Sequence, residues 1–545
     1  AKQRSVLVCG AMTIVVDIAL ISGKTVTVEA ALDDEVDALK RRAQTALGVG
    51  KGRLLDSSGT VLDGRATMKK AKLQNGDCLT LHMSRVQACG SNAAFAVILG
   101  DGSVVTWGKD VGRCAMQEQL KNVHQIQATD SAFAAILGDG SVATWGSAAA
   151  GGDSSWVQDQ LKNVQEIQAS DGAFAAILGN RSVVTWGDAL RGGDSDAVQN
   201  QLKNVQQIQA TDGAFAAILA DGSVVTWGHA VYGGDSSAVQ NQLQNVHHIQ
   251  ATNFAFAAML CDGSVVTWGC ASYGGNSTTV QSQLTDVQQI QATCWAFAAI
   301  LCDGSVVTWG CGGNGGDSSA VQEQLSNVQR IQATEGAFAA ILGDGSVVTW
   351  GDDSRGGDSY AVQNELKHVQ QIQATDGAFA ALLSDGSIVT WGSASSGGDS
   401  SHVQDQLKDV QQIQATGSAF AAILGNAAAV SWTDHDLISS AVQEQLKNVQ
   451  DIQATAGAFA AILSDGTIVP WGPAFYGGYM SEAVQDQLKT CCEWDAPALK
   501  RQPTWDGASA NVAPCLELQV PSISCNDCND AELDGGVTAL TETPI

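Results

Sequence analysis

Residues 336–351 read GAFAAILGDGSVVTWG, and close copies of this stretch recur along most of the chain. An apolar run, 337–342, precedes Asp344-Gly345, and a second run, 346–351, follows it. Because Asp-Gly accepts positive φ at low cost, this dipeptide favours a tight hairpin turn between two strands. The first run is apolar at every position, which predicts a strand that is buried on both faces.

A tryptophan near the end of the second run marks each of ten copies, and seven of the nine intervals between them are 41 residues long. A fixed period in this range indicates a propeller or a solenoid. One unit is too small to bury both faces of its sheet, so it must pack on its neighbours. Burying a large apolar side chain stabilises a fold by about 1.5–3 kcal/mol or more, so we expect the indoles in a shared core. The ten tryptophans are Trp107, Trp145, Trp186, Trp227, Trp268, Trp309, Trp350, Trp391, Trp432 and Trp471.

The segment that joins one copy to the next predicts a short helix or tight turn and then a strand. Ser237 and Gln240 have the spacing of a capping box, and apolar residues recur at helical spacing from Val239 to Val246. Residues 247–252, HHIQAT, can form a strand. Each unit is therefore predicted to be a small β-sheet with one outer segment.

These features resemble the repeats of the regulator of chromosome condensation (RCC1) family. The matching features, over residues 87–490, are the Asp-Gly turn, the SVVTWG strand, the Gly-Gly step and segments such as AVQNQLKNVQQIQA. The resemblance implies a mainly β, RCC1-like β-propeller. The blade number stays open, because ten short repeats exceed the usual range of about 4–8 blades. The alternatives are a larger ring, a closed ring with spare units, or an open β-solenoid.

The RCC1 family includes exchange factors for small GTPases and propellers within large ubiquitin ligases. The exchange factor uses a protruding β-wedge, but no repeat of this chain has an insertion long enough for one. The ligases carry a C-terminal HECT domain, and the approximately 55 residues that follow the last repeat are too few for it. We therefore expect a non-enzymatic interaction scaffold linked to ubiquitin or small-GTPase signalling. The alternative is an exchange factor or a non-catalytic component of a HERC-like ubiquitin ligase.

Residues 12–86 predict a small α+β domain that follows a leader, residues 1–11. Two β-rich runs flank SGK, an amphipathic helix pattern follows from Val36 to Leu47, and short strands complete the segment. The stretches SGKTVTVEA, RLLDSSGTVLDGRA and LQNGDCLTLHM resemble ubiquitin in the same order, which implies a ubiquitin-like (β-grasp) fold.

In ubiquitin, a hydrophobic surface patch is recognised by partner proteins. Ile21 and Leu55 match two positions of that patch, whereas Ser84 stands where the family has an apolar residue. The chain continues through SRVQACGSN instead of ending in a diglycine tail. This domain is either a partner-binding module or a folded cap on the repeats. Residues 1–86 carry about +4 charge against about −32 on the remainder, which favours docking between the two.

The whole chain has 545 residues and a formal net charge of −28. Because nucleic-acid binding requires dense Lys and Arg, we expect protein partners, including basic ones, and no direct contact with nucleic acid. The sequence contains no run of 18 apolar residues, so no membrane-spanning helix is predicted. Cysteines one repeat apart, such as Cys261 and Cys302, are expected to be free thiols in a cytoplasmic or nuclear protein.

The copies differ at two turns, which are the positions where repeat proteins carry recognition. The first turn follows each Trp-Gly, and the second precedes the apolar strand, where Phe254 and Trp295 replace glycine in adjacent units. These two aromatics predict a local binding patch; the alternative is neutral drift between duplicated units. The candidate binding residues are Phe254, Trp295, Tyr232, Tyr273, Arg355, Ile21 and Leu55.

No catalytic or cofactor constellation is recognisable in the sequence, so we expect no enzyme and no cofactor. The recurring GGDSS supplies one Asp per unit, too few for calcium, which needs about six oxygens. The tail, 491–545, is predicted to be largely disordered, although Cys525 and Cys528 have a zinc-like spacing. The end units depart from the repeat, which predicts capping units, and Pro470 predicts an edge strand.

Overall fold

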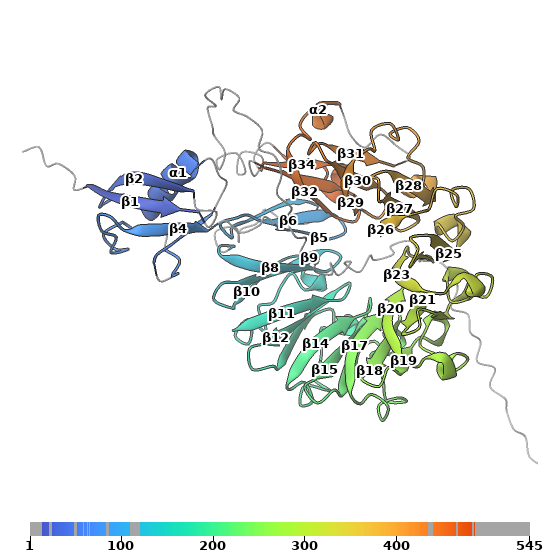
Figure 1. Ribbon diagram of the computed structural model, residues 1–545. Coiled ribbons are helices and arrows are strands. Elements are labelled where there is room, and N and C mark those ends of the chain that lie inside the picture. Colours follow the sequence, from blue (N-terminus) through green and yellow to red (C-terminus); the bar gives the residue numbers. More distant parts are fainter. Residues whose placement is uncertain are drawn as a thin grey trace, which may run out of the picture.

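The computed structural model places ten small sheets one after another around a ring, beside a separate N-terminal domain (Figure 1). The sheets are mainly antiparallel and contain three strands each. The structure describes residues 13–20, 24–47, 52–57, 59–62, 64, 66–82, 87–109, 120–433, 440–464, 467–481 and 484.

The N-terminal domain is a four-stranded sheet with one helix. Its strands are β1 (Thr13–Ala19), β2 (Thr25–Ala31), β3 (Arg53–Leu55) and β4 (Cys78–His82), in the order β2-β1-β4-β3. The β1 and β2 strands form the predicted hairpin, and β1 pairs in parallel with β4. The helix α1 (Val36–Leu47) buries the predicted face against the sheet. The Arg53 Nε donates to the Asp101 carbonyl of the first repeat unit at 3.2 Å.

Each repeat unit, numbered 1 to 10 along the chain, has a first, a middle and a last strand. The first strands are β5 (Gln87–Gly90), β8 (Val123–Ala128), β11 (Val164–Ala169), β14 (Val205–Ala210), β17 (Val246–Ala251), β20 (Val287–Ala292), β23 (Val328–Ala333), β26 (Val369–Ala374), β29 (Val410–Ala415) and β32 (Val449–Ala454). The middle strands are β6 (Ala94–Ile98), β9 (Ala132–Leu137), β12 (Ala173–Leu178), β15 (Ala214–Leu219), β18 (Ala255–Leu260), β21 (Ala296–Leu301), β24 (Ala337–Leu342), β27 (Ala378–Leu383), β30 (Phe420–Leu424) and β33 (Phe459–Leu463). The last strands are β7 (Val104–Gly108), β10 (Val142–Gly146), β13 (Val183–Gly187), β16 (Val224–Gly228), β19 (Val265–Gly269), β22 (Val306–Gly310), β25 (Val347–Gly351), β28 (Ile388–Gly392), β31 (Ala429–Trp432) and β34 (Ile468–Trp471).

Short 3-10 helices follow most of the last strands, at the positions where the sequence predicted loops. A short α-helix, α2 (Ser440–Gln443), precedes β32. The 3-10 helices that follow last strands are η1 (Ala148–Ala150), η2 (Ala189–Arg191), η3 (Ala230–Tyr232), η4 (Ala271–Tyr273), η6 (Gly312–Asn314), η8 (Asp353–Arg355), η9 (Ala394–Ser396) and η10 (Ala474–Tyr476).

The linking segment forms turns or single 3-10 turns, such as η5 (Gln281–Gln283) and η7 (Gln322–Gln324). The predicted capping box is wrong. Ser236, not Ser237, contacts Gln240, and its hydroxyl donates to the Gln240 amide oxygen at 2.8 Å. The Gln240 side chain in turn donates to the Val224 carbonyl at 2.8 Å. The Gln side chain therefore ties the segment to the edge of the last strand instead of capping a helix.

The middle strand is buried on both faces, as its apolar sequence predicts, and each face packs against a different neighbour. In unit 4, Ala214 and Ala216 face unit 5, where they contact Phe256 and Trp268. Phe256 and Trp268 are cross-strand partners, and their rings stack with centroids 5.2 Å apart. Small alanines on one side therefore make room for a large aromatic pair on the other, which joins units by close packing.

The buried indoles also form hydrogen bonds between units. The Trp268 Nε1 donates to the Gly233 carbonyl of the preceding unit at 3.0 Å. Gly233 has φ of +94°, and a β-carbon there would lie 2.6 Å from the Phe256 ring, so only glycine fits. We call this bond the indole latch. It recurs in Trp186, Trp227, Trp309, Trp350, Trp391 and Trp432, at 3.0–3.1 Å.

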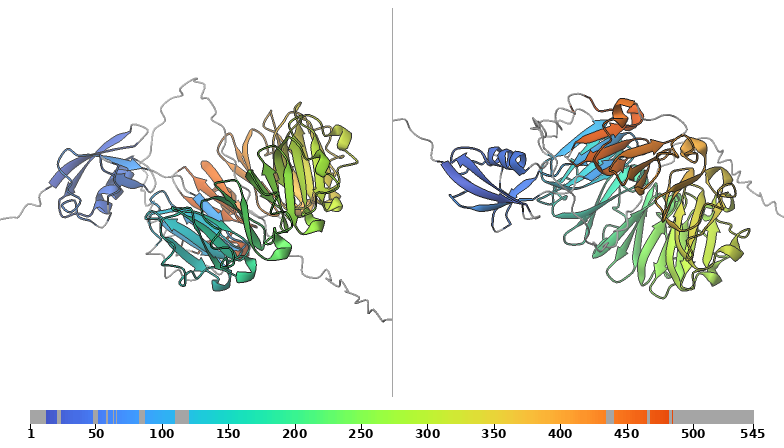
Figure 2. Two further views of the ribbon diagram at one scale, coloured as in Figure 1. Left: turned by 90° about the horizontal axis from the view of Figure 1, so that it is seen from below. Right: turned by 45° about the horizontal axis from the view of Figure 1, so that its top comes forward.

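The ring is closed, because unit 10 packs on unit 1 in the same way as any two neighbours. Phe95 and Trp107 of unit 1 share a cluster with Ala458 and Ala460 of unit 10. The Trp107 Nε1 donates to the Gly477 carbonyl at 2.7 Å across 370 residues of chain. Both views in Figure 2 show the units following one another around this ring. The expectation that the end units are caps is therefore wrong, since the two ends cover each other.

Two joints in the described part of the ring lack the usual indole latch. Each follows a unit, 1 or 9, whose sequence lacks the Gly-Gly step of the repeat. Trp145 of unit 2 is 5% exposed, and its Nε1 has no hydrogen-bond partner among the described residues. The Trp471 Nε1 of unit 10 donates to the Ser431 hydroxyl at 3.2 Å instead of a glycine carbonyl. Pro470 lies in β34, an outer strand of its sheet, and this confirms the predicted edge position.

Trp268→Phe is expected to destabilise the ring more than Trp145→Phe. Both changes remove the same indole volume, but only the first leaves a buried carbonyl, that of Gly233, without its donor. The difference is expected to be about 1–3 kcal/mol. Denaturant midpoints of the two variants and the wild type measure it. Equal destabilisation would show that the latch contributes nothing beyond packing.

Candidate interaction surface

The turns between first and middle strands lie together along one edge of the ring, which we call the rim. Consecutive rim residues are joined by backbone hydrogen bonds of 2.7–3.2 Å, in which each amide donates to the carbonyl of the next unit. These bonds hold equivalent side chains of neighbouring units close together. The rim residues are Asn92, Asp130, Asp171, Asp212, Asn253, Cys294, Glu335, Asp376, Gly417 and Ala456.

The rim concentrates carboxylates in a poorly solvated environment. Burial, and then repulsion from Asp171, raises the pKa of Asp212 to about 8. Burial, and then repulsion from Asp130, raises the pKa of Asp171 to about 7, against the opposing effect of Arg191. Burial also raises the pKa of Asp376 to about 6. The fold therefore holds these carboxyl groups where their charged forms are disfavoured.

Two arginines of the 3-10 helices already lie on rim carboxylates. In unit 3 the Arg191 guanidinium forms an ion pair with Asp171 at 2.5 Å. In unit 7 the Arg355 guanidinium pairs with Glu335, and it also lies 5.5 Å from the centre of the Trp295 ring. Both arginines occupy the last position of their helices, so this position reaches over the rim.

Between these two arginines the rim becomes aromatic, and in units 5 and 6 it lacks a carboxylate. Phe254 stacks between Tyr232 and Tyr273, with ring centroids 4.8 and 4.9 Å apart, and we call these three residues the aromatic ladder. Asn253 and Cys294 replace the acidic rim residue in units 5 and 6. The structure thus brings Phe254 together with both predicted tyrosines, whereas Trp295 lies beside Arg355; binding by these residues stays a prediction.

Apolar side chains next to the ladder are exposed to solvent. Leu190, which precedes Arg191 in η2, is 71% exposed, and Val231, which precedes Tyr232 in η3, is 53% exposed. Ladder and rim residues themselves are partly buried. Exposed apolar groups beside partly buried aromatic rings are characteristic of interaction surfaces.

The remaining candidate residues lie elsewhere. Leu55 lies in β3, partly buried, and Ile21, Cys525 and Cys528 fall outside the described residues. Within the part of the chain that the structure describes, no three His, Cys, Asp or Glu side chains gather in a way that could hold a metal ion. Among the same residues, no helix is long and apolar enough to cross a membrane.

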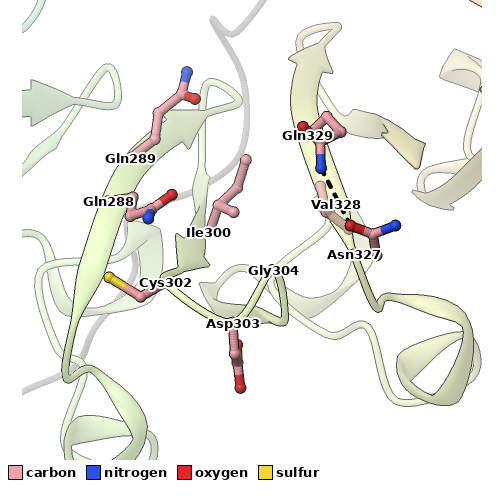
Figure 3. A pocket seen from close by; sticks show the side chains of 9 residues that line it. All are labelled: Gln288, Gln289, Ile300, Cys302, Asp303, Gly304, Asn327, Val328 and Gln329. Carbon is pink, nitrogen blue, oxygen red and sulfur yellow. Dashed lines mark hydrogen bonds between the residues drawn. The ribbon is translucent and has the colours of Figure 1, made fainter. Parts of the chain in front are cut away.

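The opposite ends of the strands form a polar hollow of about 330 Å³ between units 6 and 7 (Figure 3). Gln329 donates to the Asn327 side chain at 3.2 Å, and Cys302 lies on the neighbouring turn. The seven cysteines within the described residues form no disulfide with one another. The hollow contains no aromatic side chain and no cluster of charge, so we assign the candidate surface to the rim.

Sequence reasoning missed Arg191, Asp171, Asp212 and Asp376. Arg191 was detectable, because it occupies the same repeat position as Tyr232, Tyr273 and Arg355. The aspartates were not, because Asp is common in turns. Only the hydrogen-bonded rim shows that they approach one another.

No protein-family model matches the chain, and no curated protein matches it in sequence. Human WBSCR16 matches in structure with 14% identity and a TM-score of 0.31, over 42% of this chain and 77% of that one. The WD40 ectodomain of the Arabidopsis thaliana receptor kinase ACR4 matches with 14% identity and a TM-score of 0.27, over 57% of this chain and 97% of that one. Caldiarchaeum subterraneum ubiquitin matches 13% of this chain and 91% of its own, with 19% identity and a TM-score of 0.12. At these TM-scores the matches add nothing to the architecture seen in the chain itself.

Asp212→Asn is expected to make the stability of the ring less dependent on pH. A carboxyl group whose pKa rises on folding binds its proton more tightly in the folded state, so stability falls as pH rises from about 4 to about 8. Asn253 occupies the equivalent position in the next unit, so the rim accommodates the amide. Thermal unfolding should show the variant roughly 2–4 °C above the wild type at about pH 8.5, with the gap closing at about pH 5. A gap independent of pH would contradict the raised pKa of Asp212.

Proposed function

We propose that the protein is a non-enzymatic scaffold that binds protein partners through its rim. The observation that carries this proposal is the aromatic ladder. Glycine occupies the position of Phe254 in unit 4, as Gly213, and in unit 7, as Gly336. The fold therefore does not need an aromatic residue there, and its presence calls for a function outside the core.

The ladder also has the composition of a binding surface. Tyrosine and other aromatics are enriched at interfaces because they bury a large area and lose little conformational entropy. The Tyr232 and Phe254 rings stack, and the Tyr273 ring lies tilted against Phe254, so each ring packs on the next. A preorganised surface of this kind loses less entropy when a partner binds.

The finer assignment rests on sequence resemblance. Repeats similar to those of the RCC1 family and a ubiquitin-like N-terminal domain support a role in ubiquitin-linked or small-GTPase-linked signalling. The second candidate is an exchange factor or a non-catalytic component of a HERC-like ligase. The structure gives this second candidate less support. Both rim arginines, Arg191 and Arg355, already pair with carboxylates of the same chain.

Replacing Phe254 and Trp295 with glycine is expected to abolish partner capture and to leave the ring folded. Glycine is the residue of several other units at this position, so the backbone accommodates it. Affinity capture from the native cell, quantified by mass spectrometry, compares this double variant with the wild type. Tyr360→Ser is the matched control, since Tyr360 is 87% exposed and lies outside the ladder. Unchanged capture by the folded double variant would remove the scaffold assignment to this surface.

A nucleotide-release assay separates the two candidate functions. For a scaffold, the full chain should leave the release of labelled GDP from a panel of small GTPases at its intrinsic rate. Accelerated release would establish the exchange factor instead. The chain with residues 1–86 removed, tested for capture in parallel, reports whether the N-terminal domain binds partners or only contacts the repeats.

A further inference from the structure

We propose that the rim binds a basic peptide segment of a partner protein, with an apolar centre on the aromatic ladder and cationic side chains over the carboxylates on either side. This inference rests on the proposed scaffold function and adds the chemistry of the partner. It is carried by the order of side chains along the rim, which is acidic, then aromatic and neutral, then acidic again.

The centre of the surface selects an apolar group. Tyr232, Phe254 and Tyr273 form a continuous row of ring contacts, and the exposed Val231 precedes Tyr232 in the chain. Leu190, which is also exposed, lies in the 3-10 helix of the preceding unit. Burying such side chains against a partner is favourable because it removes apolar surface from water. Units 5 and 6 carry Asn253 and Cys294 in place of a rim carboxylate, so Asp212 beside Tyr232 is the last rim carboxyl group before Glu335 of unit 7.

The flanks select positive charge. Asp130, Asp171 and Asp212 lie on one side of the ladder, and Glu335 and Asp376 lie on the other. Arg191 pairs with Asp171 and Arg355 pairs with Glu335, whereas Asp212 and Asp376 form no ion pair with another described residue. A cation from a partner would favour the charged form of these two carboxyl groups. The chain as a whole carries −28, which adds long-range attraction for a basic partner and repels an acidic one.

The chain itself shows how the rim holds a guanidinium group. Arg355 pairs with Glu335 and covers the face of Trp295, which combines an ion pair with a cation–π contact. Arg191 pairs with Asp171. Unit 4 has the same acidic rim residue, Asp212, but its helix ends in Tyr232 instead of arginine. A cationic side chain from a partner would supply, beside the Tyr232 ring, the positive charge that unit 4 itself lacks at this position.

Burial of the flanking carboxylates gives the binding a dependence on pH. Desolvation holds the pKa of Asp171 and Asp212 high, with added repulsion from Asp130 on Asp171 and from Asp171 and Asp130 on Asp212, while Arg191 opposes this effect. Tyr232 and Asn253 also face Asp212. An added cation favours the charged carboxylates, so binding releases protons near neutral pH and strengthens as pH rises toward about 8.

The test is selection of a displayed library of short random peptides on the full chain. We expect enrichment of peptides with Arg or Lys on both sides of an aliphatic or aromatic residue. The enriched peptides should bind about tenfold more weakly to Phe254→Gly/Trp295→Gly and to Asp212→Asn. Tyr360→Ser and Trp156→Ser, which remove exposed aromatics outside the ladder, should bind as the wild type does. Circular dichroism confirms that each variant is folded.

Enrichment of peptides without basic residues, absence of enrichment, or affinity that is indifferent to the ladder variants would each overturn the inference. Capture of intact partners separates this failure from failure of the scaffold function. If capture depends on the ladder but the selected peptides are not basic, the scaffold function stands and the proposal of a basic partner is wrong. Loss of both ladder-dependent capture and basic-peptide selection would reject the scaffold function and the basic partner together.

Discussion

The packing of one unit's Phe–Trp pair into the alanine face of its neighbour is the interaction on which the rest of the structure depends. Phe256 and Trp268 of unit 5 fill the space above Ala214 and Ala216 of unit 4, and every joint repeats this arrangement. The indole latch then fixes the distance and angle between units. A three-stranded sheet with two apolar faces is not stable alone, so each unit gains its stability from both neighbours.

Closure follows from the same constraint. An open array would leave the aromatic pair of unit 1 and the alanine face of unit 10 in water. Trp107 and Gly477 instead form the same latch that joins other units, so the first and last units cover each other's apolar faces. Two of the joints are less complete, at Trp145 and at Trp471. The ring therefore tolerates local loss of the latch where packing is retained.

The rim is a consequence of this ring and explains where recognition can evolve. Backbone bonds between successive rim turns bring side chains from different units into contact, whereas the alanines and the Phe–Trp pairs of the core lie in the middle and last strands. Substitutions at the turns therefore change the surface and leave the packing intact. The aromatic ladder lies at these turns, with Tyr232 in unit 4 and Phe254 and Tyr273 in unit 5.

The sequence by itself determined the repeat, the hairpin turns, the doubly buried middle strands and the core position of the tryptophans, because these follow from local patterns and a fixed period. It also indicated the residues of the ladder, since Phe254 departs from glycine. Ring closure, the indole latch and the crowded carboxylates were decided only by the tertiary structure. They depend on contacts between units, up to 370 residues apart for Trp107 and Gly477, and the summed angle between units is not written in any one copy.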